Sequence, residues 1–154
     1  AIVSGIKYET KAPLIEKLAA LYTKVFVGGN IANEYSATLP NVFLPLDGTR
    51  DATHVADIGP QTIALWSKEI AAAPFVLWNG PVGMYEAGYV GGTDTLAHTL
   101  AVSTVRAVIG GGDTIAAVQK FSFDPERIFL STGGGAMLEY LVTGTLPGLE
   151  VLKK

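Results

Sequence analysis

The chain of 154 residues contains no cysteine and only two histidines, His54 and His98. The lack of cysteine excludes disulfides, zinc–thiolate centres and thiol nucleophiles, and two histidines are too few for a multi-histidine metal site. Only 16% of the residues are charged and 49% are apolar, a composition that excludes a disordered chain. No apolar run reaches the roughly 18 residues of a membrane span, and the net charge of −3 argues against general nucleic-acid binding.

The first residues lack a basic segment followed by an apolar run, so no signal peptide is expected. The chain starts directly in the apolar stretch Ala1–Val3, which is typical of the inside of a longer polypeptide. No linker or internal repeat divides the sequence. We therefore expect one domain over residues 1–154, monomeric and cytoplasmic, with no membrane or nucleic-acid partner.

Short apolar runs, often β-branched or aromatic, recur along the chain without alternating with polar residues, as strands buried on both faces do. Helical patterns separate most of them, which indicates βαβ units. The sequence predicts an α/β fold: a three-layer, Rossmann-like open sheet of about six mostly parallel strands with helices on both faces. The expected strands are 1–3, 24–27, 41–46, 75–78, 105–109 and 127–130, and the expected helices are 12–22 (with Pro13 in its first turn), 61–73, 93–102, 114–121 and 136–142.

One connection is unusual. Only Ser36–Pro40 separates the segment after Val27 from the expected strand 41–46, apart from a short stretch, Ile31–Tyr35, that could begin a helix. A crossover between parallel strands needs roughly a dozen residues. Either residues are missing here or the two strands are joined in an uncommon way.

Glycine is the residue in excess: 18 of the 154 residues are glycine, against an average of about 7%. The glycines gather directly after five expected strands, at Gly5, Gly28-Gly29, Gly80, Gly110–Gly112 and Gly133–Gly135. In a parallel sheet these positions share one edge, where ligands bind. Glycine lets a backbone approach a ligand closely, and helix N-termini attract phosphate. The pattern favours a phosphate-binding groove, although tight turns alone could also need the glycines.

The common nucleotide fingerprints are absent, since neither G-x-x-x-x-G-K-[ST] nor G-x-G-x-x-G occurs. Polar residues near the strand ends are nevertheless suited to phosphate. Lys7 and Lys11 could bind phosphate oxygens or be surface lysines, and Asp113 could hold magnesium or cap a helix. Glu86 could hold ribose hydroxyls or be a surface carboxylate. His54, His98 and Ser131 are interpreted as structural.

Six ordered segments, and a seventh near the C-terminus, resemble phosphoglycerate kinases over nearly the whole chain. Three signature segments are Trp78–Glu86, Ile109–Thr114 and Ser131–Ala136, and two more are Gly28–Asn33 and Asp57–Pro60. Ser4–Lys7 with Lys11 resembles the lysine-bearing loop of the family, and Leu146–Gly148 resembles its ending.

The resemblance implies the C-terminal, nucleotide-binding domain of an enzyme of glycolysis that transfers a phosphoryl group between 1,3-bisphosphoglycerate and ADP, giving 3-phosphoglycerate and ATP, with Mg²⁺. The phosphoglycerate would bind through an N-terminal domain that this chain lacks, so the chain alone is expected to be inactive. Carried over by position, Lys7 and Lys11 would contact the nucleotide phosphates and the group in transfer. Gly111, Gly112, Gly134 and Gly135 would point amides at that group; Gly5, Gly28 and Gly29 would line the adenine pocket; Asn79, Pro81 and Thr114 would contact the nucleotide, Glu86 the ribose, and Asp113 the Mg²⁺.

The chain departs from the family pattern at several places. Asn30 stands where a third glycine is usual, Gln61 replaces a lysine and Ser4 a glycine, and a helical insertion is missing around Ser36–Pro40. These departures keep open a degenerate, non-catalytic module that binds nucleotide or serves as a scaffold. A dinucleotide-dependent oxidoreductase is disfavoured by the absent G-x-G-x-x-G.

Overall fold

The computed structural model describes residues 1–6, 8–36, 39–51 and 54–152. Its centre is a six-stranded sheet in the order β3-β2-β1-β6-β7-β8, and all neighbouring strands run parallel. The sequence prediction of about six mostly parallel strands is thereby confirmed. The strands are β1 (Ile2–Val3), β2 (Val25–Val27), β3 (Val42–Phe43), β6 (Phe75–Asn79), β7 (Arg106–Gly110) and β8 (Ile128–Ser131).

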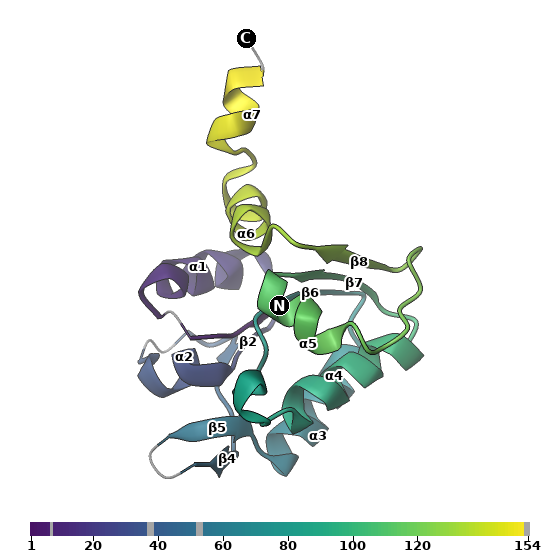
Figure 1. Cartoon of the computed structure of the whole chain (residues 1–154). Coiled ribbons are helices and arrows are strands. Elements are labelled where there is room, and N and C mark those ends of the chain that lie inside the picture. The colour runs from purple at the N-terminus through teal and green to yellow at the C-terminus, as the bar shows by residue number, and fades with distance from the viewer. Residues whose placement is uncertain (7, 37–38, 52–53, 153–154) are drawn as a thin grey trace.

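Helices cover both faces of this sheet (Figure 1), as predicted. Side chains alternate along each strand: in β6, Val76 and Trp78 join one buried cluster and Leu77 joins the other. The first cluster packs against α3, α4 and α5, and the second against α1, α2 and α6. The helices are α1 (Tyr8–Leu21), α2 (Gly29–Glu34), α3 (Pro60–Ala71), α4 (Gly91–Val102), α5 (Gly112–Val118) and α6 (Gly134–Thr143).

The strand order changes direction between β1 and β6, which are neighbours in the sheet but far apart in the chain. The chain leaves β1 for α1 on one face and leaves β6 for α4 on the other. A crevice opens at such a switch point, outside the carboxyl ends of the strands, and this is where open α/β sheets bind ligands. Ser4-Gly5 and Asn79-Gly80, at the carboxyl ends of β1 and β6, therefore lie where a ligand is expected.

Several boundaries differ from the predicted ones. The expected strand 41–46 ends at Phe43, because the amides of Leu46 and Asp47 bond to the Thr62 hydroxyl and draw the chain away from the sheet. α1 begins at Tyr8, so Pro13 lies inside the helix rather than in its first turn. Proline has no N–H for the helical ladder, and this one is tolerated on the exposed side of α1.

The connection from β2 to β3 contains the helix α2. The six residues of α2 bury Ile31 in the second cluster, and β3 then pairs with β2 in parallel. Residues 37 and 38 of this connection lie outside the described ranges. In the described part of the connection, the crossover helix is thus unusually short.

Four further elements have no counterpart in the sequence prediction. β4 (Gly48–Arg50) and β5 (Val55–Ile58) form an antiparallel hairpin beside the main sheet. α7 (Pro147–Leu152) extends beyond α6, away from the sheet (Figure 1). A short 3₁₀ helix, η1, spans Tyr85–Ala87. No helix in the described part of the chain is both long and apolar enough to cross a bilayer.

Candidate functional site

The glycine-rich segments meet at one edge of the sheet, as the sequence predicts. The pairing register sets Val27, Val3, Asn79, Gly110 and Ser131 side by side at the carboxyl ends of five neighbouring strands. The residues that follow each of them are therefore level with one another. This arrangement turns five separate sequence segments into one continuous rim.

Three of these glycines are required because protein backbone fills the place of a side chain. A Cβ at Gly80 would lie 2.0 Å from the Ser4 carbonyl oxygen, and one at Gly29 would lie 2.9 Å from the Gly5 backbone. A Cβ at Gly134 would lie 2.5 Å from the Gly111 Cα. Real Cβ contacts are essentially never this short, so these glycines hold the neighbouring loops together.

At other glycines on the same rim, no neighbouring protein atom would exclude a side chain. A Cβ at Gly112, Gly133 or Gly135 would have no protein atom within 4 Å, and none of the three has a positive φ. Packing therefore does not explain them. Gly112 and Gly135 lie in the first turns of α5 and α6, where backbone N–H groups have no partner within the helix. Amides without a helical partner, at glycines that leave open space beside the backbone, suit an anion that approaches closely.

Lys11 supplies a positive charge at this rim. It lies in the second turn of α1, and its Nζ donates a hydrogen bond to the Ser4 carbonyl oxygen, directly over Gly5. Burial lowers the pKa of Lys11 to about 8, and the nearby Asp113 carboxylate opposes part of that shift. The Nζ of this half-buried lysine could bind a phosphate oxygen in place of the Ser4 carbonyl oxygen. Lys7, the other predicted cation, lies outside the described residues.

Polar side chains under the rim fix the loop after β6. Asn79 is buried and its Nδ2 donates to the Gly110 carbonyl at 2.9 Å. The Thr114 hydroxyl accepts from the Gly80 amide at 2.8 Å and donates to the same carbonyl at 2.9 Å. The hydroxyl of Thr114 thus helps to position the loop after β6, and its contact with a nucleotide stays a prediction.

The Gly111 amide is also engaged, because it donates to the Ser131 carbonyl at 2.9 Å. Its φ of +101° favours glycine as the residue before α5. The amide role that the resemblance implies for Gly111 stays a prediction. Gly112 and Gly135 are the glycines in the first turns of α5 and α6 at which a Cβ would meet open space.

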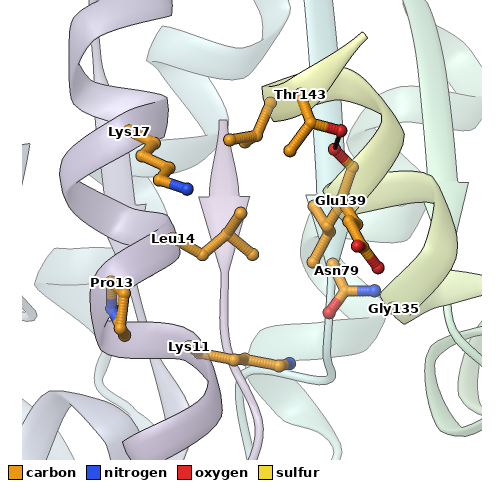
Figure 2. A pocket seen from close by; sticks show the side chains of 10 residues that line it. Lys11, Pro13, Leu14, Lys17, Asn79, Gly135, Glu139 and Thr143 are labelled. Atoms are coloured by element: carbon orange, nitrogen blue, oxygen red, sulfur yellow. Dashed lines mark hydrogen bonds between the residues drawn. The ribbon is translucent and has the colours of Figure 1, made fainter. Parts of the chain in front are cut away.

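A cleft of about 390 Å³ lies between α1 and α6 and begins at this rim (Figure 2). In Figure 2, Lys11 reaches from α1 toward Asn79 and the start of α6, where Gly135 lies. Farther along, Leu14 and Leu138 give the cleft apolar walls, and Lys17 and Glu139 flank it. The polar end of the cleft thus brings together the lysine and the glycine-rich helix start that the sequence predicts.

A second hollow, of about 250 Å³, lies between α2 and the β4–β5 hairpin. Gly29 and Val82 are on its wall, so it adjoins the loops after β2 and β6. Gly28 is buried, and a Cβ there would lie 3.2 Å from Cγ1 of Val82 and 3.3 Å from the Ser4 hydroxyl. Pro81 precedes Val82 in the same loop, and its carbonyl accepts a 2.6 Å hydrogen bond from the Ser4 hydroxyl. Glu86 is exposed in η1, one turn farther along.

Asp113 is the residue that could hold Mg²⁺. It lies exposed in the first turn of α5, close enough to Lys11 to interact with its charge. The described residues contain no group of three or more acidic or imidazole side chains fit for a metal. A single carboxylate agrees with Mg²⁺, which usually keeps several waters and takes its remaining ligands from substrate phosphates.

Sequence reasoning missed two polar residues that shape the site. Ser4 joins the loops after β1 and β6 through its hydroxyl. Asp57 is buried, accepts from the amides of Ile58 and Gly92, and so fixes the start of α4; burial raises its pKa. The signal was a carboxylate directly before Ile58-Gly59, in a stretch that is otherwise apolar.

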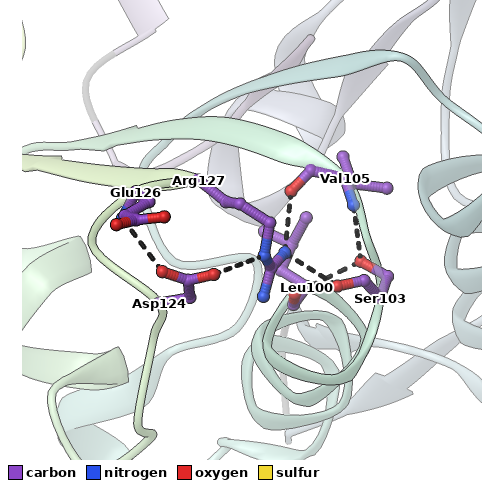
Figure 3. Close-up of polar contacts among 6 residues, drawn as sticks. All are labelled: Leu100, Ser103, Val105, Asp124, Glu126 and Arg127. Atoms are coloured by element: carbon purple, nitrogen blue, oxygen red, sulfur yellow. Dashed lines mark hydrogen bonds and ion pairs between the residues drawn. The ribbon is translucent and has the colours of Figure 1, made fainter.

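A different polar cluster surrounds Arg127 at the opposite, amino-terminal edge of the sheet (Figure 3). Its guanidinium donates to Asp124 at 2.9 Å and to the carbonyls of Ser103 and Val105 at 2.7 and 3.1 Å. These bonds tie the turn before β7 to the turn before β8. Because these partners are backbone carbonyls and one carboxylate that join two turns of the fold, we interpret this cluster as structural.

Comparison with known proteins identifies the family of the chain. The family model for phosphoglycerate kinase matches residues 37–144. The phosphoglycerate kinase from Coxiella burnetii is 30% identical with a TM-score of 0.75, over 99% of this chain and 52% of that one. The enzyme from Pyrococcus horikoshii is 22% identical with a TM-score of 0.80, over 99% of this chain and 51% of that one. The chain therefore spans about half the length of these relatives, and it belongs to the phosphoglycerate kinase family.

Proposed function

We propose that residues 1–154 form the nucleotide-binding half of a cytoplasmic phosphoglycerate kinase of glycolysis. The reaction is reversible phosphoryl transfer between 1,3-bisphosphoglycerate and ADP, giving 3-phosphoglycerate and ATP. The observation that carries the proposal is the rim where Lys11, Asp113 and the open glycines Gly112 and Gly135 converge. A further half of the enzyme, of the kind that completes the length of the relatives, would hold the phosphoglycerate.

The residues of the rim suit the chemistry of this transfer. The bond between phosphorus and the acyl oxygen breaks, a bond to a β-phosphate oxygen of ADP forms, and the acyl oxygen leaves as part of a carboxylate. Such a step needs in-line positioning and neutralisation of charge more than covalent help from the protein. Lys11 would bind an oxygen of the moving group, and the amides of Gly112 and Gly135 would bind its other oxygens. Mg²⁺ held by Asp113 would neutralise phosphate charge when bound.

The phosphates of the nucleotide would occupy the first hollow and the base would occupy the second. The phosphates would lie at the cationic end of the cleft between α1 and α6, near Lys11 and Gly135. The base would enter the hollow beside Gly29 and Val82, whose walls combine apolar and polar side chains. Pro81 and Glu86 lie on the loop after β6, where the ribose would pass, and Gly5 lies between the two hollows against Gly29.

Calorimetric titration of the chain with Mg-ADP tests this function. We expect saturable binding below millimolar nucleotide, and no turnover of 1,3-bisphosphoglycerate in a coupled assay, because the chain offers one substrate site. The absence of any saturable heat at millimolar Mg-ADP would contradict the proposed function. Full activity of the chain by itself would contradict the assignment of the phosphoglycerate site to another domain.

A methyl group at Gly135 separates a ligand role from a packing role. Gly135→Ala adds a Cβ that meets no protein atom, so we expect the free energy of unfolding to rise by about 0.5 kcal/mol through the helix preference for alanine. We expect Mg-ADP affinity to fall about ten-fold, because the methyl group would keep a phosphate oxygen from the amide. Urea unfolding and calorimetry measure the two effects.

Gly148→Ala is the matched control. Gly148 is likewise the second residue of its helix, α7, and a Cβ there also meets no protein atom. It lies outside the cleft, so this variant should gain the same stability and bind Mg-ADP unchanged. An equal loss of affinity in both variants, or none in either, would show that Gly135 does not face the nucleotide.

A further inference from the structure

We propose that Arg50 makes the hollow beside Gly29 favour a 6-oxopurine base, such as guanine, over adenine. The inference rests on the nucleotide-binding function proposed above and concerns which nucleotide the site prefers. Arg50 is the last residue of β4, in the hairpin that forms the outer wall of the hollow. It brings a positively charged donor to a space that is lined by both apolar and acidic residues, among them Val82, Asp47 and Asp57.

The two carboxylates on this hollow are already engaged by backbone amides. Asp47 accepts from the amides of Gln61 and Thr62 at 2.9 and 2.8 Å and so caps α3. Asp57 accepts from the amides of Ile58 and Gly92, both at 2.9 Å. Their positions are therefore fixed by the fold. Neither forms an ion pair with Arg50 in the described part of the chain.

Two polar side chains on the hollow have no such engagement. Within the described ranges, no hydrogen bond or ion pair involves the guanidinium of Arg50 or the amide of Asn33. Both residues are exposed and both line the hollow. Arg50 offers only donors, whereas Asn33 offers a donor and an acceptor. A base that enters would meet these two groups as its polar partners.

The donor pattern of Arg50 matches guanine and opposes adenine. A guanidinium forms two parallel hydrogen bonds with O6 and N7 of guanine, which are both acceptors. Adenine has an amino group in place of O6, and its N–H donors would face the donors of arginine. The amide oxygen of Asn33 and the negative field of Asp47 and Asp57 would in turn favour the N1–H and N2–H donors of guanine.

The test is calorimetric titration of the chain with Mg-ADP, Mg-GDP and Mg-IDP. IDP keeps O6 and N7 but lacks the 2-amino group, so it isolates the edge that Arg50 would read. We expect GDP and IDP to bind about ten-fold more tightly than ADP, the lower part of the range for a bidentate arginine–guanine pair. Arg50→Leu should remove this preference and leave the affinity for ADP within about two-fold.

Arg50→Lys separates base recognition from simple charge. Lysine keeps the positive charge but loses the planar fork, so we expect this variant to lose most of the preference for GDP and IDP. An equal loss for all three nucleotides in Arg50→Leu would overturn the inference, because it would assign Arg50 to the phosphates. Equal binding of ADP and GDP by the unaltered chain would overturn it too, while leaving the proposed function intact. Failure of all three nucleotides to bind would overturn both.

Discussion

We expect the replacement of Lys11 by methionine to lower the affinity for Mg-ADP about 30-fold at pH 7, because it removes a charge-assisted hydrogen bond to phosphate. Methionine preserves most of the buried stem of the side chain and its packing. Lys17→Met is the matched control: Lys17 belongs to the same helix and lines the same cleft, farther from the glycine-rich rim. Calorimetry should show less than about a three-fold change for that variant.

The pH dependence of Mg-ADP affinity and of stability provides a second, independent test of Lys11. The pKa of Lys11 is about 8 in the folded chain, against 10.5 for an unperturbed lysine. Phosphate favours the charged form, so affinity should be highest below pH 8 and should fall as the pH rises above it. Between pH 8 and 10.5 the unfolded chain binds more protons at this residue than the folded chain, so stability should rise over that window.

Affinity and stability are thus expected to move in opposite directions above about pH 8. Calorimetry and urea unfolding between about pH 7 and 10 measure the two trends. The contribution of Lys11 to both slopes should vanish in Lys11→Met. Slopes that are the same in the variant and the unaltered chain would show that another group titrates and that Lys11 is not the phosphate partner.

The Gly80→Ala substitution is expected to destabilise the fold by about 3 kcal/mol or more, which corresponds to a fall in Tm of about 10 °C. Two causes add. Gly80 has a φ of +95°, which L side chains rarely adopt, and its Cβ would lie 2.0 Å from the Ser4 carbonyl oxygen. Because that contact joins the loops after β1 and β6, nucleotide affinity should fall as well. Thermal unfolding followed by circular dichroism measures the first effect.

Gly88→Ala separates the two causes. Gly88 has a φ of +87° but a Cβ there would meet no atom within 4 Å. We expect this variant to lose about 1 kcal/mol, the cost of the backbone conformation alone. If Gly80→Ala proved no more harmful than Gly88→Ala, the close approach of the two loops would not be the feature that holds this edge together.

The position of the glycine-rich rim could be predicted from the sequence, but the separate roles of its glycines could not. Glycines after Val27, Asn79 and Gly110 pointed to one sheet edge because parallel strands end on the same side. Which glycines face a ligand depends on contacts between distant segments. Gly134 lies against Gly111, whereas Gly135, its neighbour in the chain, faces open space. Adjacent glycines of identical appearance in the sequence therefore have different roles.

Other features leave no mark in the periodicity of the sequence. The hydroxyl of Thr114 bonds to the Gly80 amide and the Gly110 carbonyl, and the first of these contacts joins distant segments of the chain. The β4 strand consists of Gly48, Thr49 and Arg50, all exposed, so it lacks the apolar residues by which strands are recognised. The hairpin, and with it the outer wall of the hollow beside α2, could only be found from the structure.

The level ends of five strands also determine when the site can form during folding. Neighbours on the rim are distant in the chain: Val3 pairs with both Val27 and Asn79, and Gly110 pairs with Ser131. Parallel pairings of this kind close long loops and form slowly. No continuous segment contains the rim, so nucleotide binding is expected only in the final kinetic phase of refolding. A fluorescence or heat signal that depends on bound nucleotide would then report when the sheet is complete. Bound nucleotide would stabilise only the finished fold.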